Sequence, residues 1–523
     1  MSRVLGIEGT AWCASAALYD TATDDVRIES EAYQPESGGI HPREAAEHMR
    51  EAIPAVVTRV REAADDEVDA VAFSRGPGLG PCLRIVATAA RALAGTLDVP
   101  LVGVNHMVAH LEIGRHTSGF EDPVCLNASG ANAHLLGYRN GRYRVLGETM
   151  DTGVGNAIDK FTRHLDWTHP GGPKVEEHAK RGEYVDLPYV VKGMDFSFSG
   201  IMSAAKQAVD DGTPVEDVCF SLQENVFGML TEVSERALSV TDSDQLVLGG
   251  GVGQNARLRE MLAEMCEDRG AEFHAPDPRF LRDNAGMIAV LGATMYDAGD
   301  TIAIEASAVD PDFRPDEVPV TWRETAPERS RAGDPDEVRG AEALVTLGER
   351  VRKQRRPKRY RHPELDERLR TERTRSEARV TSEARRAGVP TPVVYDVDDR
   401  EAELTFERVG RADLRESLVE ERVREVARHL AACHAAGFVH GDPTPRNARV
   451  GEDRTYLIDF GLAYYTEDVE DYAMDLHVFA EALSGTADDA DSLQTAFEEA
   501  YREAGDPTVV DQLREIEGRG RYQ

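Results

Sequence analysis

The stretch "VLGIEGTAWCASAALYD", Val4 to Asp20, joins two short apolar runs through a turn of small residues. Apolar runs of this length bounded by glycine predict β-strands, so we expect strand, turn and strand. A second stretch, "VCLNASGANAHLLGYRNG", Val124 to Gly141, has the same pattern and adds a hairpin. Turns of this kind expose backbone N–H groups that can bind phosphate. The repetition indicates two related halves within one domain.

A third glycine turn follows in "LVLGGGVGQNARLREML", Leu246 to Leu262, where a strand is expected to lead through the glycines into a helix. A helix N-terminus adds a favourable dipole for an anion. One glycine turn most often only turns the chain. Three of them in this order predict a duplicated, two-lobe actin-like (ASKHA) ATPase-type α/β fold that binds a nucleotide.

The composition bounds the class of protein. A chain of 523 residues is long enough for two to four domains, and its 41% hydrophobic content is that of a folded protein. The 95 acidic residues exceed the 60 basic ones, a net charge of -35, which we interpret as a solvated surface suited to high salt. Such a charge repels nucleic acid unless a basic patch, a partner or salt offsets it, so RNA binding is not excluded.

Six scattered cysteines, without a CxxC pair, favour reduced thiols in a cytoplasm. Glu8 interrupts the apolar N-terminus, and no later stretch offers the roughly 18 uncharged residues that a membrane span needs. We therefore expect a soluble, cytoplasmic protein without a targeting segment.

Changes in composition and in the pattern of expected strands and helices divide the chain into two domains. Strand and helix patterns alternate over residues 1–322, and residues 323–337 lose apolar character and gain Pro, Gly and charge, which predicts a linker. A second domain is expected over residues 338–523.

His106 and His110 in "GVNHMVAHLEIG" are spaced to share one face of a helix, as metal ligands or as histidines satisfied by hydrogen bonds. Met107 stands where a zinc protease of the HExxH type needs glutamate. Asp283 in "RFLRDNAGMIAVLGA" is the best third ligand, and it could also cap the helix that follows.

At this point the first domain resembles a known family. The motifs that carry the resemblance occur in order over residues 2–322: "GIEGTA", "VNHMVAH", "SGANAH", "DTGVGNAIDKFTR", "HPGGPKVEEHA", "FSFSGIMSA", "GGGVGQNARLREM" and "DNAGMIA". They are similar to those of the universal tRNA threonylcarbamoyltransferase family, the catalytic subunit of the archaeal and eukaryotic KEOPS complex.

The resemblance implies a reaction and a set of sites. The family moves the threonylcarbamoyl group of threonylcarbamoyl-adenylate to the exocyclic amine of the adenosine beside the anticodon, in tRNAs that read codons beginning with A. It implies one iron or zinc ion on His106, His110 and Asp283. The positions implied to hold the adenylate are Asn127, Ala128, Ser129, Gly130, Ala131, Asp159, Gly172, Glu176 and Asn255.

One position departs from the family. Asn127 stands where the family usually has a tyrosine near the metal. The amide could ligate weakly through its carbonyl, leave a coordination position to water, or contact only substrate. The identity and coordination number of the metal therefore stay open, whereas the two histidines and the aspartate do not depend on this position.

The second domain contains "VHGDPTPRNARV" and "YLIDFGLA", in which Asp442, Asn447 and Asp459 have the spacing of a kinase catalytic loop and DFG motif. These predict Asp442 as proton acceptor and Asn447 and Asp459 as ligands of magnesium and ATP. Gly441 replaces the usual arginine, and no GxGxxG loop precedes. Instead "GAEA" stands in the phosphate-covering position, and its residues Gly340, Ala341 and Glu342 are predicted to contact ATP. Lys353 is the expected phosphate-binding lysine, and Glu377 is its expected partner.

This half resembles the small, RIO-like atypical kinase of the same complex, a bilobal α+β fold that works chiefly as an ATPase and can phosphorylate serine. The basic run "RKQRRPKRYR", Arg352 to Arg361, has seven basic residues in ten and is either a tRNA contact or a solvated helix face.

Our leading interpretation is a fusion of transferase and kinase/ATPase, with tRNA, threonylcarbamoyl-adenylate, ATP and small accessory KEOPS subunits as partners and no membrane association. Two alternatives stay open at this point. One is a signalling Ser/Thr kinase with a non-catalytic nucleotide-binding scaffold half, and the other is a non-catalytic tRNA scaffold.

Overall fold

The computed structural model describes residues 1–33, 41–62, 67–139, 141–323, 337–484, 486–487 and 489–519. These form two compact units. The first contains Met1–Tyr189 and the described residues from Ser197 to Arg323, and the second contains Val190–Phe196 and the described residues from Glu337 onward. Most of the expected linker lies outside the described residues.

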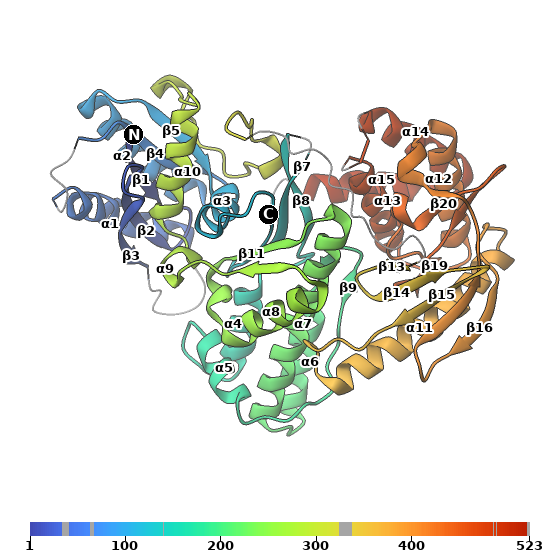
Figure 1. The fold of residues 1–523 in the computed structure, drawn as a ribbon. Helices are drawn as coiled ribbons and strands as arrows, with labels where there is room; N and C mark the ends of the chain where they lie inside the picture. Colours follow the sequence, from blue (N-terminus) through green and yellow to red (C-terminus); the bar gives the residue numbers. More distant parts are fainter. Residues whose placement is uncertain are drawn as a thin grey trace. The chain divides into compact units, whose positions relative to one another are not determined.

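The first unit holds two five-stranded sheets with the same topology (Figure 1). The strand orders are β3-β2-β1-β4-β5 and β12-β11-β6-β7-β8. When the strands of each lobe are numbered from one to five along the chain, the two orders are the same, read from opposite edges of the sheet. The bounds in the first lobe are β1 (Arg3–Glu8), β2 (Cys13–Asp20), β3 (Asp25–Ala32), β4 (Ala70–Gly76) and β5 (Leu101–Asn105), with helices α1 (Pro42–Glu62), α2 (Gly80–Leu97), α3 (His106–Ser118) and α10 (Ala285–Asp297). This repeat confirms the predicted two-lobe actin-like fold.

The second lobe follows the same plan. Its strands are β6 (Val124–Ala128), β7 (Ala133–Arg139), β8 (Arg142–Glu148), β11 (Gln245–Gly249) and β12 (Glu272–His274). Its helices are α4 (Val154–His164), α5 (Gly172–Ala179), α6 (Ser199–Asp210), α7 (Val215–Thr241), α8 (Ala256–Arg269) and α9 (Pro278–Leu281). The three glycine turns fall where the sequence predicts them: between β1 and β2, between β6 and β7, and between β11 and α8.

Helix α10 lies directly on the sheet of the first lobe because both surfaces carry small residues. A Cβ atom on Gly6 of β1 would lie 2.5 Å from the Ala285 carbonyl oxygen, and one on Gly292 would lie 2.3 Å from Ala72 Cβ. Side chains at these glycines would push the helix away. The contact fixes the start of α10, and with it Asp283, over the end of β1.

Helix α3 is fixed at its first residue. The Asn105 Oδ1 atom accepts hydrogen bonds from the backbone N–H groups of Met107 (3.0 Å) and Val108 (3.1 Å), which is the usual way to start a helix. Farther along, Gly114 packs against Val247 of β11, where an added Cβ would lie 2.9 Å from the valine Cβ. Thus α3 is held against both lobes.

The side chain of Arg323, the first residue of the expected linker, is only 5% exposed and packs into the first unit. Its guanidinium lies 2.9 Å from Glu112 Oε1 on α3 and 2.6 Å from Asp122 Oδ1, and it stacks over the Tyr138 ring. Glu112 also accepts a hydrogen bond from the Tyr143 hydroxyl. The charge that suggested a linker therefore forms a buried ion pair.

Replacing Arg323 by alanine should destabilise the first unit, because Glu112 would stay buried without its cation. The expected cost is about 3–5 kcal/mol, seen as a lower midpoint of the first thermal transition by calorimetry. Arg59→Ala is the matched control, since its pair with Glu29 is half-exposed and should contribute at most about 1 kcal/mol. Equal midpoints for the two variants would contradict the importance of the buried pair.

The second unit is bilobal, as expected for a small kinase-like domain. One lobe is the sheet β13-β14-β15-β17-β16 with one long helix, and the other is mainly helical. The bounds of the first lobe are β13 (Glu337–Arg339), β14 (Ala343–Leu347), β15 (Arg350–Arg355), β16 (Val394–Asp398), β17 (Glu403–Glu407) and α11 (Pro363–Arg386). The other lobe has β18 (Ala412–Asp413), β19 (Phe438–Val439), β20 (Ala448–Val450), β21 (Thr455–Leu457), β22 (Tyr464–Tyr465), α12 (Glu420–Ala435), α13 (Val469–Ser484), α14 (Ala490–Ala504) and α15 (Pro507–Arg519). The short hairpin of β9 (Val191–Lys192) and β10 (Asp195–Phe196) groups with this unit.

Candidate metal centre and phosphate sites

Three side chains far apart in the sequence converge at the start of α3 and just before α10. Asp283 Oδ1 lies 3.4 Å from His106 Nε2 and 3.4 Å from His110 Nε2, and all three ligand atoms lie within 4.8 Å of one another. Two ligand atoms about 2.1 Å from one ion in a tetrahedral arrangement lie about 3.4 Å apart. The donor set and its spacing therefore fit a single metal ion.

Two further side chains support this cluster, and the sequence did not indicate either role. Glu8, which is completely buried at the end of β1, places Oε2 3.2 Å from His106 Nδ1. The Trp12 indole donates to Asp283 Oδ2 at 3.0 Å. Metal-binding histidines and carboxylates commonly have such outer partners, which fix the ligand orientation. The only available signal was a lone acid in the apolar strand that contains Glu8.

Asp283 does not cap α10. The cap is Asn284, whose Oδ1 accepts from the Met287 N–H at 3.2 Å. This corrects the prediction that Asp283 could serve as both cap and ligand: the cap's side chain must turn toward the helix N–H groups, and Asn284 does so. Asp283 is left to face the histidines.

The electrostatics of the cluster are dominated by two carboxylates. Burial by itself lowers the pKa of His106, but Glu8 and Asp283 outweigh it and raise the pKa to about 10. For His110 burial prevails, and its pKa is lowered. Buried carboxylates need nearby positive charge. A divalent cation on the three ligands would meet that need.

Asn127 is the last residue but one of β6, and its amide lies on the side of the sheet that faces His110. Its Oδ1 would lie 2.6 Å from a Cβ atom on Gly250, so glycine is needed there for the amide to occupy its place. His134 on β7 is the cross-strand partner of Asn127, and burial lowers its pKa to about 3, with the charges of His110 and His106 adding to the effect.

The turn after β6 packs closely against the start of α4. The Ser129 hydroxyl accepts from the Asn132 N–H, and the Gly130 carbonyl accepts from the Asn156 N–H at 2.9 Å. A Cβ on Gly153 would lie 2.4 Å from the Ala131 carbonyl carbon, so only glycine allows this approach. The predicted turn residues Ala128, Ser129, Gly130 and Ala131 therefore lie against the N-terminus of α4.

The remaining predicted adenylate residues follow along the same lobe. Asp159 on α4 accepts from the Gly171 N–H at 2.7 Å, next to Gly172, where an added Cβ would meet open space. Glu176 on α5 accepts from the Ala256 N–H at 3.2 Å, next to Asn255, the cap of α8. These contacts bring Asp159, Gly172, Glu176 and Asn255 into one region of the second lobe.

In the second unit, the predicted phosphate lysine is buried and pairs with two carboxylates, of which Glu377 is buried and Asp459 is partly exposed. Lys353 Nζ on β15 lies 2.9 Å from Glu377 Oε1 on α11 and 2.6 Å from Asp459 Oδ1. Burial lowers the pKa of Lys353, but Asp459 and Glu377 outweigh it and raise it. The arrangement matches the lysine, glutamate and aspartate that a kinase needs together.

The predicted catalytic loop is anchored by Asp475, whose role was not predicted from the sequence. Asn447 Nδ2 donates to Asp442 Oδ2 at 3.0 Å, as the predicted pair requires. Asp475, buried on α13, accepts from the N–H groups of His440 (2.6 Å) and Gly441 (2.8 Å). The sequence signal that could have revealed Asp475 is an acidic residue inside the otherwise apolar helix "YAMDLHVF".

The basic run from Arg352 to Arg361 is a strand end and a turn, so the predicted solvated helix face is wrong. Strand alternation turns Lys353 and Arg355 inward, and Arg355 lies 2.5 Å from Glu377 Oε2. Arg361 is also buried. Near it, Lys358 donates to the Ala341 carbonyl, in the turn between β13 and β14 that holds Gly340, Ala341 and Glu342. Much of the run therefore organises the predicted ATP site.

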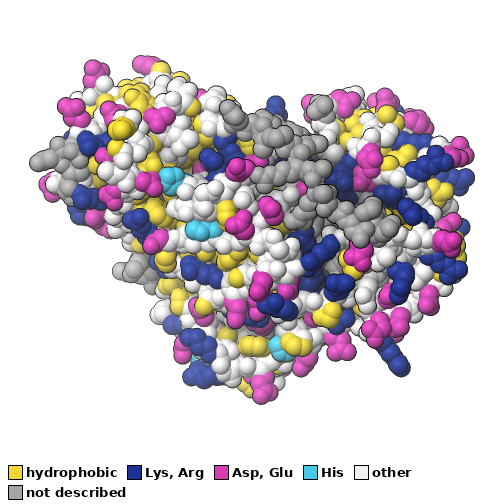
Figure 2. All heavy atoms as spheres, in the orientation of Figure 1, with side chains coloured by type: hydrophobic (Ala, Val, Ile, Leu, Met, Phe, Trp, Pro, Cys, Tyr) yellow, Lys and Arg dark blue, Asp and Glu magenta, His cyan; other side chains and the backbone are white. Residues whose placement is uncertain are grey.

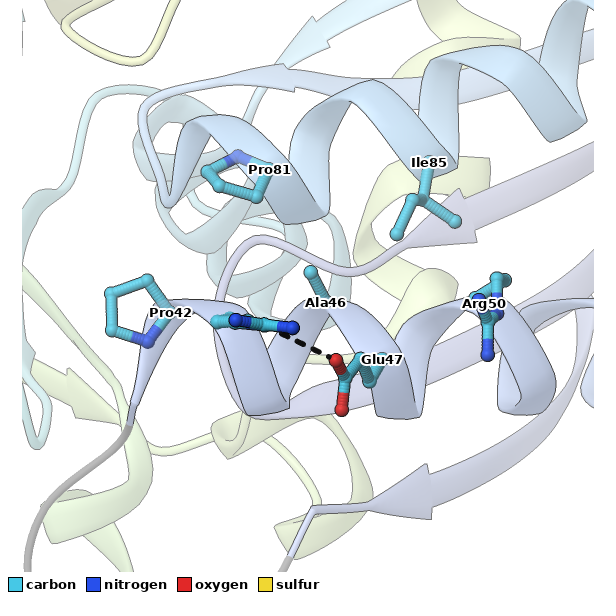
Figure 3. Close-up of a pocket in the computed structure, with 7 residues that line it drawn as sticks. Pro42, Ala46, Glu47, Arg50, Pro81 and Ile85 are labelled. Atoms are coloured by element: carbon cyan, nitrogen blue, oxygen red, sulfur yellow. Dashed lines mark hydrogen bonds and ion pairs between the residues drawn. The ribbon is translucent and has the colours of Figure 1, made fainter.

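A surface pocket of the first unit lies elsewhere. It is lined by α1 and α2 through Pro42, Arg43, Ala46, Glu47, Arg50, Pro81 and Ile85 (Figure 3). None of the predicted site residues lines it. On the face shown in Figure 2, acidic and basic side chains are intermingled. All six cysteines are buried and free. Within the described ranges, no helix combines the length and apolar character needed to cross a membrane.

Models of two protein families match separate parts of the chain. The model of the tRNA N6-adenosine threonylcarbamoyltransferase family matches residues 22–290, and that of the phosphotransferase enzyme family matches residues 399–513. A probable bifunctional tRNA threonylcarbamoyladenosine biosynthesis protein of Halobacterium salinarum is 72% identical, covering 100% of this chain and 99% of its own. One of the same description from Natronomonas pharaonis is also 72% identical, covering 100% of both chains.

Among solved structures, HypF of T. kodakarensis is 13% identical and covers 59% of this chain and 50% of its own, with a TM-score of 0.43. The full-length relatives and the two family models decide the assignment. The chain belongs to the family of bifunctional tRNA threonylcarbamoyladenosine biosynthesis proteins, with a threonylcarbamoyltransferase domain followed by a kinase-like phosphotransferase domain.

Proposed function

We propose that the first unit transfers the threonylcarbamoyl group of threonylcarbamoyl-AMP to the N6 amine of the adenosine next to the anticodon, in tRNAs that read codons beginning with A. The observation that carries the proposal is the convergence of His106, His110 and Asp283 at the spacing of a metal site. The amine nitrogen attacks the carbamoyl carbonyl carbon, a C–N bond forms, the C–O bond to the phosphate breaks, and AMP leaves. The amine proton passes to solvent.

The residues of the second lobe hold the adenylate in this proposal. The turn of Ser129, Gly130 and Ala131 presents backbone N–H groups to the phosphate, and the carboxylates of Asp159 and Glu176 bind ribose hydroxyls. Gly172 leaves room for the nucleoside. One iron or zinc ion, bound by the two histidines and Asp283, would supply Lewis-acid polarisation of the carbamoyl carbonyl.

For the second unit we infer an ATPase that can also phosphorylate serine or threonine. Asp442 accepts the proton of the attacking water or hydroxyl, a new bond forms to the γ-phosphorus, and ADP leaves. Asn447 and Asp459 would hold magnesium, Lys353 would bind the phosphates, and the turn of Gly340, Ala341 and Glu342 would cover them. ATP turnover supports the transfer reaction, and a shared chain keeps the two units at high effective concentration.

We further infer that tRNA is the substrate of the first unit, that small accessory KEOPS subunits assist in the cytoplasm, and that residues 323–337 link the units. The exposed arginines of the basic run, Arg352, Arg356 and Arg359, are the part of it that can still meet the tRNA backbone.

The decisive experiment is an in vitro transfer assay with threonylcarbamoyl-AMP and unmodified tRNA, with and without ATP and accessory subunits. Chelation should abolish modified adenosine, and one of iron or zinc should restore it. Transfer that survives complete metal removal would refute the metal role. No transfer under any condition, with kinase activity present, would favour a signalling kinase with a scaffold half.

A further inference from the structure

In the described part of the chain, four buried polar atoms without a hydrogen-bond partner belong to His110 and to two residues of the neighbouring sheet, Asn127 and His134. They are His110 Nδ1, Asn127 Oδ1 and both ring nitrogens of His134, and none has a hydrogen-bond partner among the described residues. His134 is completely buried, Asn127 is 4% exposed, and His110 is 1% exposed. Such atoms normally have partners in native proteins, because each one left unpaired costs about 1–3 kcal/mol.

These atoms belong to neighbouring residues. Asn127 on β6 and His134 on β7 are directly paired across an antiparallel ladder, so their side chains share one face of the sheet, with Cβ atoms about 4.5–5.5 Å apart. Gly249, paired with Asn127 on its other side, shows where that face points. A Cβ on Gly249 would lie 3.4 Å from Asn127 Oδ1 and 3.5 Å from His110 Cβ. The Asn127 amide therefore extends toward α3.

The donor and acceptor inventory suggests how the three side chains combine. His110 presents Nε2 to Asp283, so a metal there requires the proton of its neutral ring on Nδ1. The Asn127 carbonyl oxygen has two lone pairs and can accept from His110 Nδ1 and from one nitrogen of His134. His134 is not among the residues whose ligand atoms cluster at the metal site, so it acts from behind.

We propose that His134 is a positioning residue of the metal centre: when the metal is bound, His134 donates a hydrogen bond to the Asn127 oxygen, and that oxygen accepts from the Nδ1–H group of His110. The proposal rests on the metal site proposed above. It assigns Asn127 a place behind the ligand His110, as an acceptor for its N–H group. A buried histidine without this task would be costlier than an apolar side chain of similar size.

The test uses the full chain stripped of metal and titrated with Co²⁺ alone, with affinity measured by competition with a chromophoric chelator and geometry by Co²⁺ absorption. His134→Leu should weaken Co²⁺ binding by about 10–100-fold and shift the absorption bands. His134→Gln, whose amide can donate to the same oxygen, should stay close to wild type. His274→Leu, the same change on β12 of the same sheet, is the matched control.

The outcomes separate a positioning role from simple packing. Unchanged Co²⁺ affinity and spectrum in His134→Leu, with equal or higher thermal stability, would overturn the proposal. So would equal loss in the Leu and Gln variants together with lowered stability, which indicates packing alone. If wild type binds no Co²⁺ and behaves like His106→Ala, the metal site itself is wrong, and this inference falls with it.

Discussion

Replacing His106 by alanine is expected to abolish metal binding by the first unit and to lower threonylcarbamoyl transfer at least about a hundredfold, while ATP turnover continues. His106 is one of the three proposed ligands, and it also links the site to the buried Glu8 carboxylate. With alanine there, only His110 and Asp283 remain to hold an ion. The measurements are metal content of the purified chain and modified adenosine in tRNA by mass spectrometry.

His116→Ala provides the control on the same helix. His116 lies near the end of α3 and bonds to Asp24 at 2.8 Å, so its loss should leave both metal and transfer unchanged. Wild-type transfer by His106→Ala would show that the histidine pair has no part in the reaction. Loss of transfer in both variants would point to damage to α3 instead.

Replacing Asp459 by asparagine should lower ATP turnover by about a hundred- to a thousandfold. The carboxylate is the predicted magnesium ligand and pairs with Lys353, so the amide removes charge from both. Lys353 keeps Glu377, so the fold of the unit should survive. The measurement is steady-state release of phosphate, and transfer in a single turnover by the first unit should persist.

The control for this prediction is Asp399→Asn. Asp399 forms an exposed pair with Arg375 in the same unit, and its loss should not alter ATP turnover. Undiminished ATP turnover in Asp459→Asn would support a non-catalytic scaffold role for the second unit.

The fold could be predicted from the repeated strand and turn pattern because that pattern depends only on residues close together in the sequence. Alternating apolar runs and small-residue turns depend on neighbours in sequence, and they placed all three glycine turns correctly. The His106, His110 and Asp283 set came from spacing and from the family resemblance, and the structure brings it together. Its detailed ligand roles remain predictions.

The supporting residues could not be predicted because their contacts span long separations. Glu8 and His106 are 98 residues apart, and Trp12 and Asp283 are 271 apart. Arg323 gave a misleading signal for the same reason, since a charged residue in a charged stretch reveals no buried partner. The helix cap was predicted at Asp283 but lies one residue later, at Asn284. Sequence signals for helix ends are uncertain by one or two residues.

The packing of α10 on the first sheet has a consequence for synthesis. The first lobe begins with β1 but is completed only by α10, which ends at Asp297 after the whole second lobe has been made. At about 5–20 residues per second, roughly 10 to 40 s separate the emergence of α3 from that of α10. During this interval the nascent chain exposes the sheet face that α10 later covers, and the histidines lack Asp283. The proposed metal site is therefore complete only after α10 has been made, so all three ligands come together late in synthesis.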